Sequence, residues 1–142
     1  MAGLNSYIQF RYFQHRLQYL CSGLLKVIGV DKPITTKYSA DEGIDFYGKL
    51  KLEKFVFSEH HFPGVQQQLD CWLIGQAKHY LNLDVSTVEI RELVGSVELA
   101  KARAFGSIGE KYLDLQVRVC DPVFYLFFTT GRLTSASWQL LK

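Results

Sequence analysis

Residues 6–28 read SYIQFRYFQHRLQYLCSGLLKVI, and their apolar side chains recur at steps of three and four. The stripe runs through Phe10, Phe13, Leu17, Leu20, Leu24, Val27 and Ile28. This spacing is typical of one face of an α-helix. Asn5 or Ser6 can cap such a helix and Gly29 can end it, so we predict a helix over residues 6–28.

The last sixty residues follow a different period. Residues 111–119 read KYLDLQVRV, where apolar and polar side chains alternate as in a half-buried strand. Residues 88–91 and 97–104 alternate in the same way, although the composition of residues 98–105 also favours a helix. A long helix followed by many strands predicts an α+β fold with a bent, mostly antiparallel sheet.

The remaining segments complete this expectation. Residues 123–128 are wholly apolar and fit a central strand, and residues 133–141 close the predicted meander. Residues 30–45 are interpreted as a loop and residues 49–57 as the first strand. Helical spacing of apolar residues predicts a second helix over 65–81, in which Gly75 would cost roughly 1 kcal/mol against Ala.

Size and composition indicate one domain spanning residues 1–142. Aromatic residues make up 14% of the chain, more than a core of this size hides easily, so we expect a homodimer joined through apolar surface on the sheet. Cys21, Cys71 and Cys120 are sparse and odd in number, which favours free thiols and a cytoplasmic location. We expect no signal peptide, no transmembrane segment and no cofactor.

Charge is distributed unevenly although the net charge is only +2. Residues 1–38 carry five basic side chains against Asp31 alone, whereas the rest of the chain is mildly acidic. This polarity favours self-association or an acidic partner, or it marks a solvated helix face. Residues 7–19 mix aromatic and basic side chains, a composition that can bind RNA or a membrane surface. Arg11 and Arg16 are too few for a typical nucleic-acid surface, so nucleic acid is not expected as a partner.

His60 and His61 are the most reactive-looking pair in the sequence and follow Glu59 in a predicted turn. Adjacent histidines can carry out acid–base chemistry or bind a metal. The ligand spacing of a metal site is missing, so we expect no metal and interpret them first as surface residues.

Asp45, Tyr47 and Arg118 are the other candidate ligand-binding residues, because each lies beside or within a predicted strand. Asp114 and Arg118 are four residues apart in the alternating segment and would share one face of the sheet. Inside a curved sheet such a pair could orient a ligand. On an outer face it would be an ordinary charge pair.

The order of elements resembles the nuclear transport factor 2-like superfamily. The resemblance rests on the long first helix, on Phe46-Tyr47-Gly48 and on the closing meander through Trp138. It implies helices against a bent sheet around a conical pocket, in a superfamily of both enzymes and non-enzymatic binding subunits. The long helix over 65–81 and the missing Asp/His pair depart from that pattern.

Three functions follow as expectations. The first is a non-catalytic subunit that binds a small hydrophobic or polar ligand or a protein partner, as a small oligomer. The second is a pocket enzyme of the isomerase, dehydratase or hydrolase type, with general acid–base chemistry by Asp45, Tyr47, His61 or Arg118. The third is an RNA- or membrane-contacting factor that acts through the first helix.

Overall fold

The computed structural model describes residues 2–36, 43–50, 70–80, 82–102 and 114–142. Its elements, in chain order, are α1 (Ala2–Ile28), β1 (Ile34–Thr35), β2 (Phe46–Leu50), β3 (Cys71–Lys78), α2 (Thr87–Ala102), β4 (Val123–Thr129) and α3 (Ser135–Leu140). Three helices and one sheet confirm the predicted α+β class, including the long first helix.

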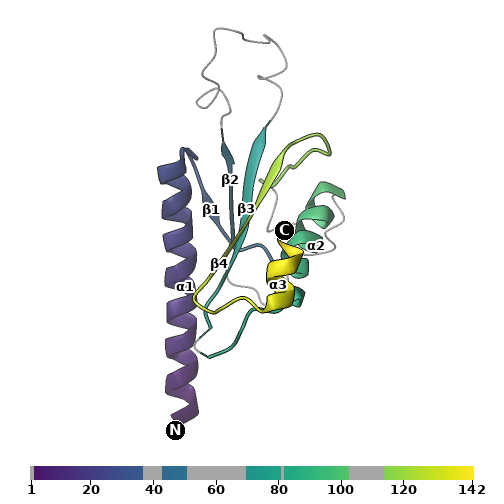
Figure 1. Ribbon diagram of the computed structural model, residues 1–142. Helices are drawn as coiled ribbons and strands as arrows, with labels where there is room; N and C mark the ends of the chain where they lie inside the picture. The colour runs from purple at the N-terminus through teal and green to yellow at the C-terminus, as the bar shows by residue number, and fades with distance from the viewer. Residues whose placement is uncertain (1, 37–42, 51–69, 81, 103–113) are drawn as a thin grey trace.

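The four strands form one mixed sheet in the order β1-β2-β3-β4. The β1–β2 and β2–β3 pairs are antiparallel, whereas β3 and β4 run parallel. Parallel neighbours need a crossover, and α2 supplies it between β3 and β4. Figure 1 shows α1 along one side of the sheet and α2 with α3 on the other.

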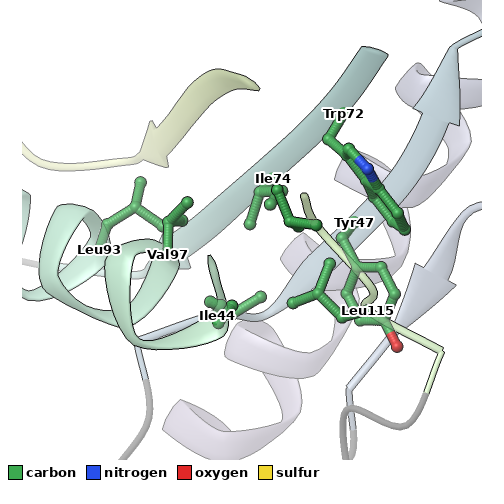
Figure 2. Close-up of a cluster of buried hydrophobic side chains, with 9 residues drawn as sticks. Ile44, Tyr47, Trp72, Ile74, Leu93, Val97 and Leu115 are labelled. Carbon is green, nitrogen blue, oxygen red and sulfur yellow. The ribbon is translucent and has the colours of Figure 1, made fainter. Parts of the chain in front are cut away.

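The core consists of two apolar layers, one on each face of the sheet. On the α1 side, Cys21 and Leu25 pack against Phe46, Leu73 and Ala77. On the α2 side, helix and strand residues interlock with two residues of the segment that precedes β4 (Figure 2). The members of this second layer include Tyr47, Trp72, Ile74, Leu93, Val97, Leu115 and Val117.

The predicted helix over 65–81 is wrong where the structure describes it, because residues 71–78 form strand β3. Residues 65–69 and 81 lie outside the described part. Gly75 has a packing reason in the strand: a Cβ there would lie 2.2 Å from Cζ of Phe46 and 2.6 Å from the carbonyl oxygen of Leu126. The first strand is confirmed only over Lys49 and Leu50, the end of β2, since residues 51–57 lie outside the described part.

The predicted strands over 88–91 and 97–104 are also wrong, because helix α2 covers residues 87–102. The alternative helical interpretation of residues 98–105 is correct as far as residue 102. A capping box begins α2: Ser86 Oγ accepts from the N–H of Val88 at 3.2 Å, and Glu89 Oε2 accepts from the N–H of Ser86 at 3.0 Å. Local capping and burial at helical spacing outweigh the short alternation.

The segment over 111–119 is not a strand between residues 114 and 119, although Leu115 and Val117 are buried as expected. Residues 111–113 lie outside the described part. β4 confirms the strand over 123–128 but lies at the edge of the described sheet, so Phe124 is 58% exposed and Leu126 only partly buried. Residues 135–140 form helix α3 instead of closing a meander.

Helix α1 is confirmed over residues 6–28, but it begins earlier, at Ala2, so Asn5 and Ser6 lie inside the helix and do not cap it. It ends before Gly29, whose positive φ of 112° is the left-handed turn that glycine favours. The side of the helix that faces the sheet differs from the expected one. The buried positions are Gln14, Gln18, Cys21, Ser22 and Leu25. In the predicted apolar stripe Phe13 is half exposed and Leu17 partly buried, whereas Leu20, Leu24 and Val27 are exposed.

No helix in the described residues is both long and apolar enough to cross a membrane. Cys21, Cys71 and Cys120 are free thiols, the first two buried and the third exposed.

Candidate functional site

Asp45 lies directly before β2 and is tied to the end of the neighbouring strand. Its Oδ2 accepts from the N–H of Ala77 at 2.8 Å, and its own N–H donates to the carbonyl of Gly75 at 2.9 Å. Thr36 donates from its hydroxyl to the Asp45 carbonyl at 3.1 Å. These contacts fix the carboxylate at one end of the sheet.

Two glutamines of α1 reach this end of the sheet from the helix side. Gln18 donates from Nε2 to Oδ1 of Asp45 at 2.7 Å. Gln14 donates to the carbonyl of Ala77 and accepts from the N–H of His79 at 2.8 Å. Gln18 is fully buried, yet its Oε1 has no hydrogen-bond partner in the part of the chain that the structure describes. An unpaired buried amide oxygen costs free energy, so a further group beside it would be stabilising.

The last residues of β3 add an amide and an ammonium group. Gln76 is buried, and its amide is satisfied when its nitrogen donates to the carbonyl of Glu89 at 3.3 Å and its oxygen accepts from Lys78 Nζ at 3.1 Å. Lys78 Nζ also lies 3.5 Å from Oε2 of Glu92 on α2. The charges of Lys78 and Glu92 both act on Asp45. We call Gln18, Asp45, Gln76, Lys78 and Glu92 the Asp45 cluster.

Gly43 allows the segment before Asp45 to approach α2 closely. Its φ is +66°, and a Cβ at this position would lie 2.5 Å from Oγ of Ser96 and 3.1 Å from the carbonyl oxygen of Glu92. Only glycine fits both the backbone conformation and the space. The cluster therefore draws on α1, β3 and α2 together with the entry to β2.

Burial raises the pKa of Asp45 above its ordinary value, although bonds from Ala77 and Gln18 and the charge of Lys78 act in the opposite direction. Burial and the nearby Asp45 charge also raise the pKa of the Cys21 thiol, to about 11. Functional sites frequently contain a carboxylate whose ionised form is costly to maintain. A cation beside Asp45 would offset this cost.

The donor set of the Asp45 cluster is rich in oxygen. Asp45 and Glu92 provide carboxylates, and Gln18 and Gln76 provide amide oxygens. Such ligands suit Mg²⁺ or Mn²⁺, and Mg²⁺ is commonly held by one or two carboxylates together with substrate phosphates. Within the described ranges no three Cys, His, Asp or Glu side chains group to form a metal site.

Of the sequence-predicted site residues, the structure places only Asp45 in this cluster. Tyr47 is buried in the core layer under α2, and burial raises its pKa to about 12, with a smaller effect from the charge of Asp114. Arg118 binds Asp121, with its Nη2 2.8 Å from Oδ1, beside Trp72 at the opposite end of β3. Its predicted pairing with Asp114 along one strand is wrong, because residues 114–119 form no strand. His60 and His61 lie outside the described residues.

Gln18, Gln76, Lys78 and Glu92 were not singled out from the sequence. The interpretation of residues 65–81 as a helix separated Gln76 and Lys78 from Asp45. The run from Cys71 to Ala77 ends in Gln76-Ala77-Lys78, and polar residues at the end of an apolar strand are a recognisable signal of a site. The capping residues Ser86 and Glu89 would have placed α2, and with it Glu92.

No family model matches this chain, and no curated protein or solved structure matches it either.

Proposed function

We propose that this protein is a divalent-metal-dependent hydrolase of phosphodiesters, a nuclease, with the Asp45 cluster as its active site. The observation that carries the proposal is the convergence of the Asp45 carboxylate, the Gln76 amide and the Lys78 ammonium at one end of two adjacent strands. Glu92 joins them from α2. A carboxylate for a hard cation and a lysine for a phosphate oxygen are what this hydrolysis requires.

Each member of the cluster has a chemical role in this proposal. Asp45, with Glu92 and the Gln76 oxygen, would hold Mg²⁺ or Mn²⁺. The bound metal would lower the pKa of a water and offset phosphate charge. Lys78 would stabilise the negative charge that grows on the phosphate oxygens when the water oxygen attacks phosphorus and the P–O bond to the leaving sugar oxygen breaks. Gln18 would position Asp45.

A nucleic-acid substrate is supported by the charge of the helix that borders the site. The described part of α1 carries exposed Arg11, Arg16 and Lys26 and no acidic side chain. Gln14 anchors this helix to Ala77 and His79, directly beside Lys78. A basic surface next to a phosphate-handling site favours a polyanion. From the sequence we expected neither a metal nor a nucleic-acid partner. That expectation treated the first helix alone, without the Asp45 cluster beside it, and this proposal replaces it.

The test is hydrolysis of end-labelled single- and double-stranded DNA and of RNA by the purified chain with Mg²⁺ or Mn²⁺, against the same reaction with chelator. We expect metal-dependent cleavage that Lys78→Ala reduces by about 10²–10³-fold. Lys101→Ala is the matched control, because Lys101 also forms an ion pair with a glutamate of α2, Glu98, at 2.9 Å. The control should retain full activity.

Two results would overturn the proposal. One is the absence of cleavage of all three substrates by well-folded protein with either metal. The other is cleavage that Lys78→Ala leaves unchanged, since it would come from another site or a contaminant. Titration calorimetry with Mn²⁺ gives an independent readout: the chain should bind the ion, and Asp45→Asn should weaken binding at least tenfold.

A second candidate is the non-catalytic interaction subunit expected from the sequence. It is favoured by the amount of exposed apolar surface, which includes Phe124, Trp138 and Leu141 as well as the outer face of α1. A folded protein that binds neither metal nor nucleic acid would support this function instead. A cytoplasmic location, a small-molecule ligand and the likeness to the nuclear transport factor 2-like superfamily stay predictions.

A further inference from the structure

The outer face of α1 is apolar and largely exposed, although Phe13 lies against the ring of His79, with 5.4 Å between ring centroids, and Leu17 is partly buried against the core layer on the α1 side. Phe13 is 50% exposed, Leu20 is 69% exposed and Val27 is 84% exposed. The side of the same helix that contacts the sheet buries the polar residues Gln14 and Gln18 together with Cys21 and Leu25. An amphipathic helix of a soluble protein normally keeps its apolar side chains on the side that faces the core.

The spacing of the outer residues is that of a helix–helix seam. Phe13, Leu17, Leu20, Leu24 and Val27 follow one another at steps of four, three, four and three. This is the a/d pattern of a coiled coil, with a mean period of 3.5 residues. The two heptads extend over about 21 Å at 1.5 Å per residue. This row of apolar side chains can therefore pack against another helix that has the same spacing.

Gly23 is a second, independent feature of this face. It lies inside α1 between Leu20 and Val27, and a Cβ at Gly23 would meet nothing within 4 Å. Glycine inside a helix costs roughly 1 kcal/mol against alanine, and no contact among the described residues requires it at this position. A glycine at this position would allow the backbone of a second helix to approach α1 closely.

We propose that this face binds α1 of a second copy of the chain, giving a two-fold symmetric dimer. The exposed side chains of the outer face offer on the order of 500 Å² per copy, from rings and branched aliphatic groups. Two copies would bury about 1,000 Å² there, the lower limit for a specific interface. A two-fold interface needs one self-complementary patch, and a heptad seam is such a patch.

The positive charge of α1 allows binding of a second α1 to be distinguished from binding to an acidic partner. Arg11, Arg16 and Lys26 are the charged residues in the described part of α1, so two helices placed together repel each other weakly. Added salt screens that repulsion and should tighten the dimer. Docking of α1 on an acidic surface, including the acidic body of a second copy, should instead weaken with salt.

Sedimentation velocity across a micromolar concentration series, at about 50 and 500 mM salt, tests this proposal. We expect a dimer that Leu20→Ser/Val27→Ser weakens by roughly 100-fold or more. The matched control is Leu83→Ser/Val119→Ser, because Leu83 is 67% and Val119 86% exposed and neither belongs to α1. The control should leave association unchanged. Gly23→Arg, which improves helix propensity, should also give folded monomers.

A wild-type monomer at these concentrations would overturn the proposal. Equal weakening by both double variants, or a dimer that dissociates as salt rises, would also overturn it. The proposal goes beyond the nuclease function and is independent of it, because association is measured without metal or substrate. A Lys78→Ala protein that no longer cleaves but still forms the dimer would show that the dimer does not depend on the nuclease site.

Discussion

Gln18 donates a hydrogen bond from Nε2 to Oδ1 of Asp45 at 2.7 Å, across the boundary between α1 and the sheet. The oxygen of the same amide, Oε1, is buried without a hydrogen-bond partner among the described residues. The helix therefore presents Gln14 and Gln18 to the sheet beside the apolar Cys21 and Leu25. These two buried amides form the helix side of the polar cluster at the end of the sheet.

Asp45→Asn is expected to abolish hydrolysis and, at the same time, to stabilise the fold. The change removes a buried carboxylate whose charged form is costly, and the Asn oxygen can still accept the hydrogen bond from the N–H of Ala77. We expect the free energy of unfolding to rise at neutral pH, on the order of 1 kcal/mol. Urea denaturation of both proteins checks this, and a clear loss of stability would contradict the account of the cluster.

The stability gain of Asp45→Asn should depend on pH. Because the folded pKa of Asp45 is raised, the wild type loses stability as pH rises from the ordinary value of 3.8 through the folded value. The advantage of the variant should be complete at neutral pH and vanish below about pH 3.8. Unfolding curves at four or five pH values test the sign, and an advantage that grows on acidification would be inconsistent with it.

The three thiols should differ in reactivity. Cys120 is exposed, whereas Cys21 and Cys71 are buried, and burial raises the pKa of both buried thiols. A thiol reagent at pH 8 should therefore modify one cysteine quickly in the native protein and three in denaturant, without a reducing agent. Cys120→Ser should remove the fast reaction. Rapid modification of two or more native thiols would mean that α1 does not cover the sheet as described.

Sequence periodicity predicted the long helix α1 because its stripe repeats over several helical turns, whereas β4 was predicted from a short, wholly apolar run rich in aromatic residues between turn residues. It failed at β3, since Trp72, Leu73 and Ala77 fit a helical stripe and a fully buried strand equally well. A strand covered on both faces has no alternation to detect. Gly75 was the local clue, because such a position in a strand marks the close approach of another group.

Asp45 could be identified from the sequence as a polar residue at a strand end, but its partners could not. Gln18 is 27 residues away in the sequence and lies outside the apolar stripe from which the helix was predicted. Lys78 and Glu92 required β3 and α2 to be assigned correctly. Which helix face meets a sheet is decided by packing across the whole domain, and the helical period alone does not contain that information.

Asp121→Asn should destabilise the fold in a pH-dependent way. Asp121 is only 4% exposed and accepts from Nε of Arg118 at 2.9 Å and from Nε1 of Trp72 at 3.3 Å. Burial alone would raise its pKa, but the bonds from Arg118 and Trp72 more than offset this and lower it. We expect a loss of about 2 kcal/mol at neutral pH.

The sign of the pH effect is opposite to that at Asp45. The folded pKa of Asp121 is lowered, so its contribution is present above the ordinary value of 3.8 and is lost as pH falls through the folded value. Wild type and Asp121→Asn should therefore converge in stability in acid. Asp70→Asn, which removes an exposed carboxylate that pairs with Lys49, is the control and should change stability by less than about 1 kcal/mol at any pH.

Gly75→Ala distinguishes the strand from the helix that the sequence predicted. In a helix the substitution would stabilise the protein by roughly 1 kcal/mol, because alanine has the higher helix propensity. In β3 the new methyl group would overlap the Phe46 ring and the Leu126 carbonyl, so we expect a loss of about 1–3 kcal/mol. Gly95→Ala is the control. A Cβ at Gly95 in α2 meets nothing within 4 Å, so this substitution should stabilise the protein. Chemical denaturation of both variants decides the matter, and a stabilising Gly75→Ala would rule out this packing of β3 against Phe46.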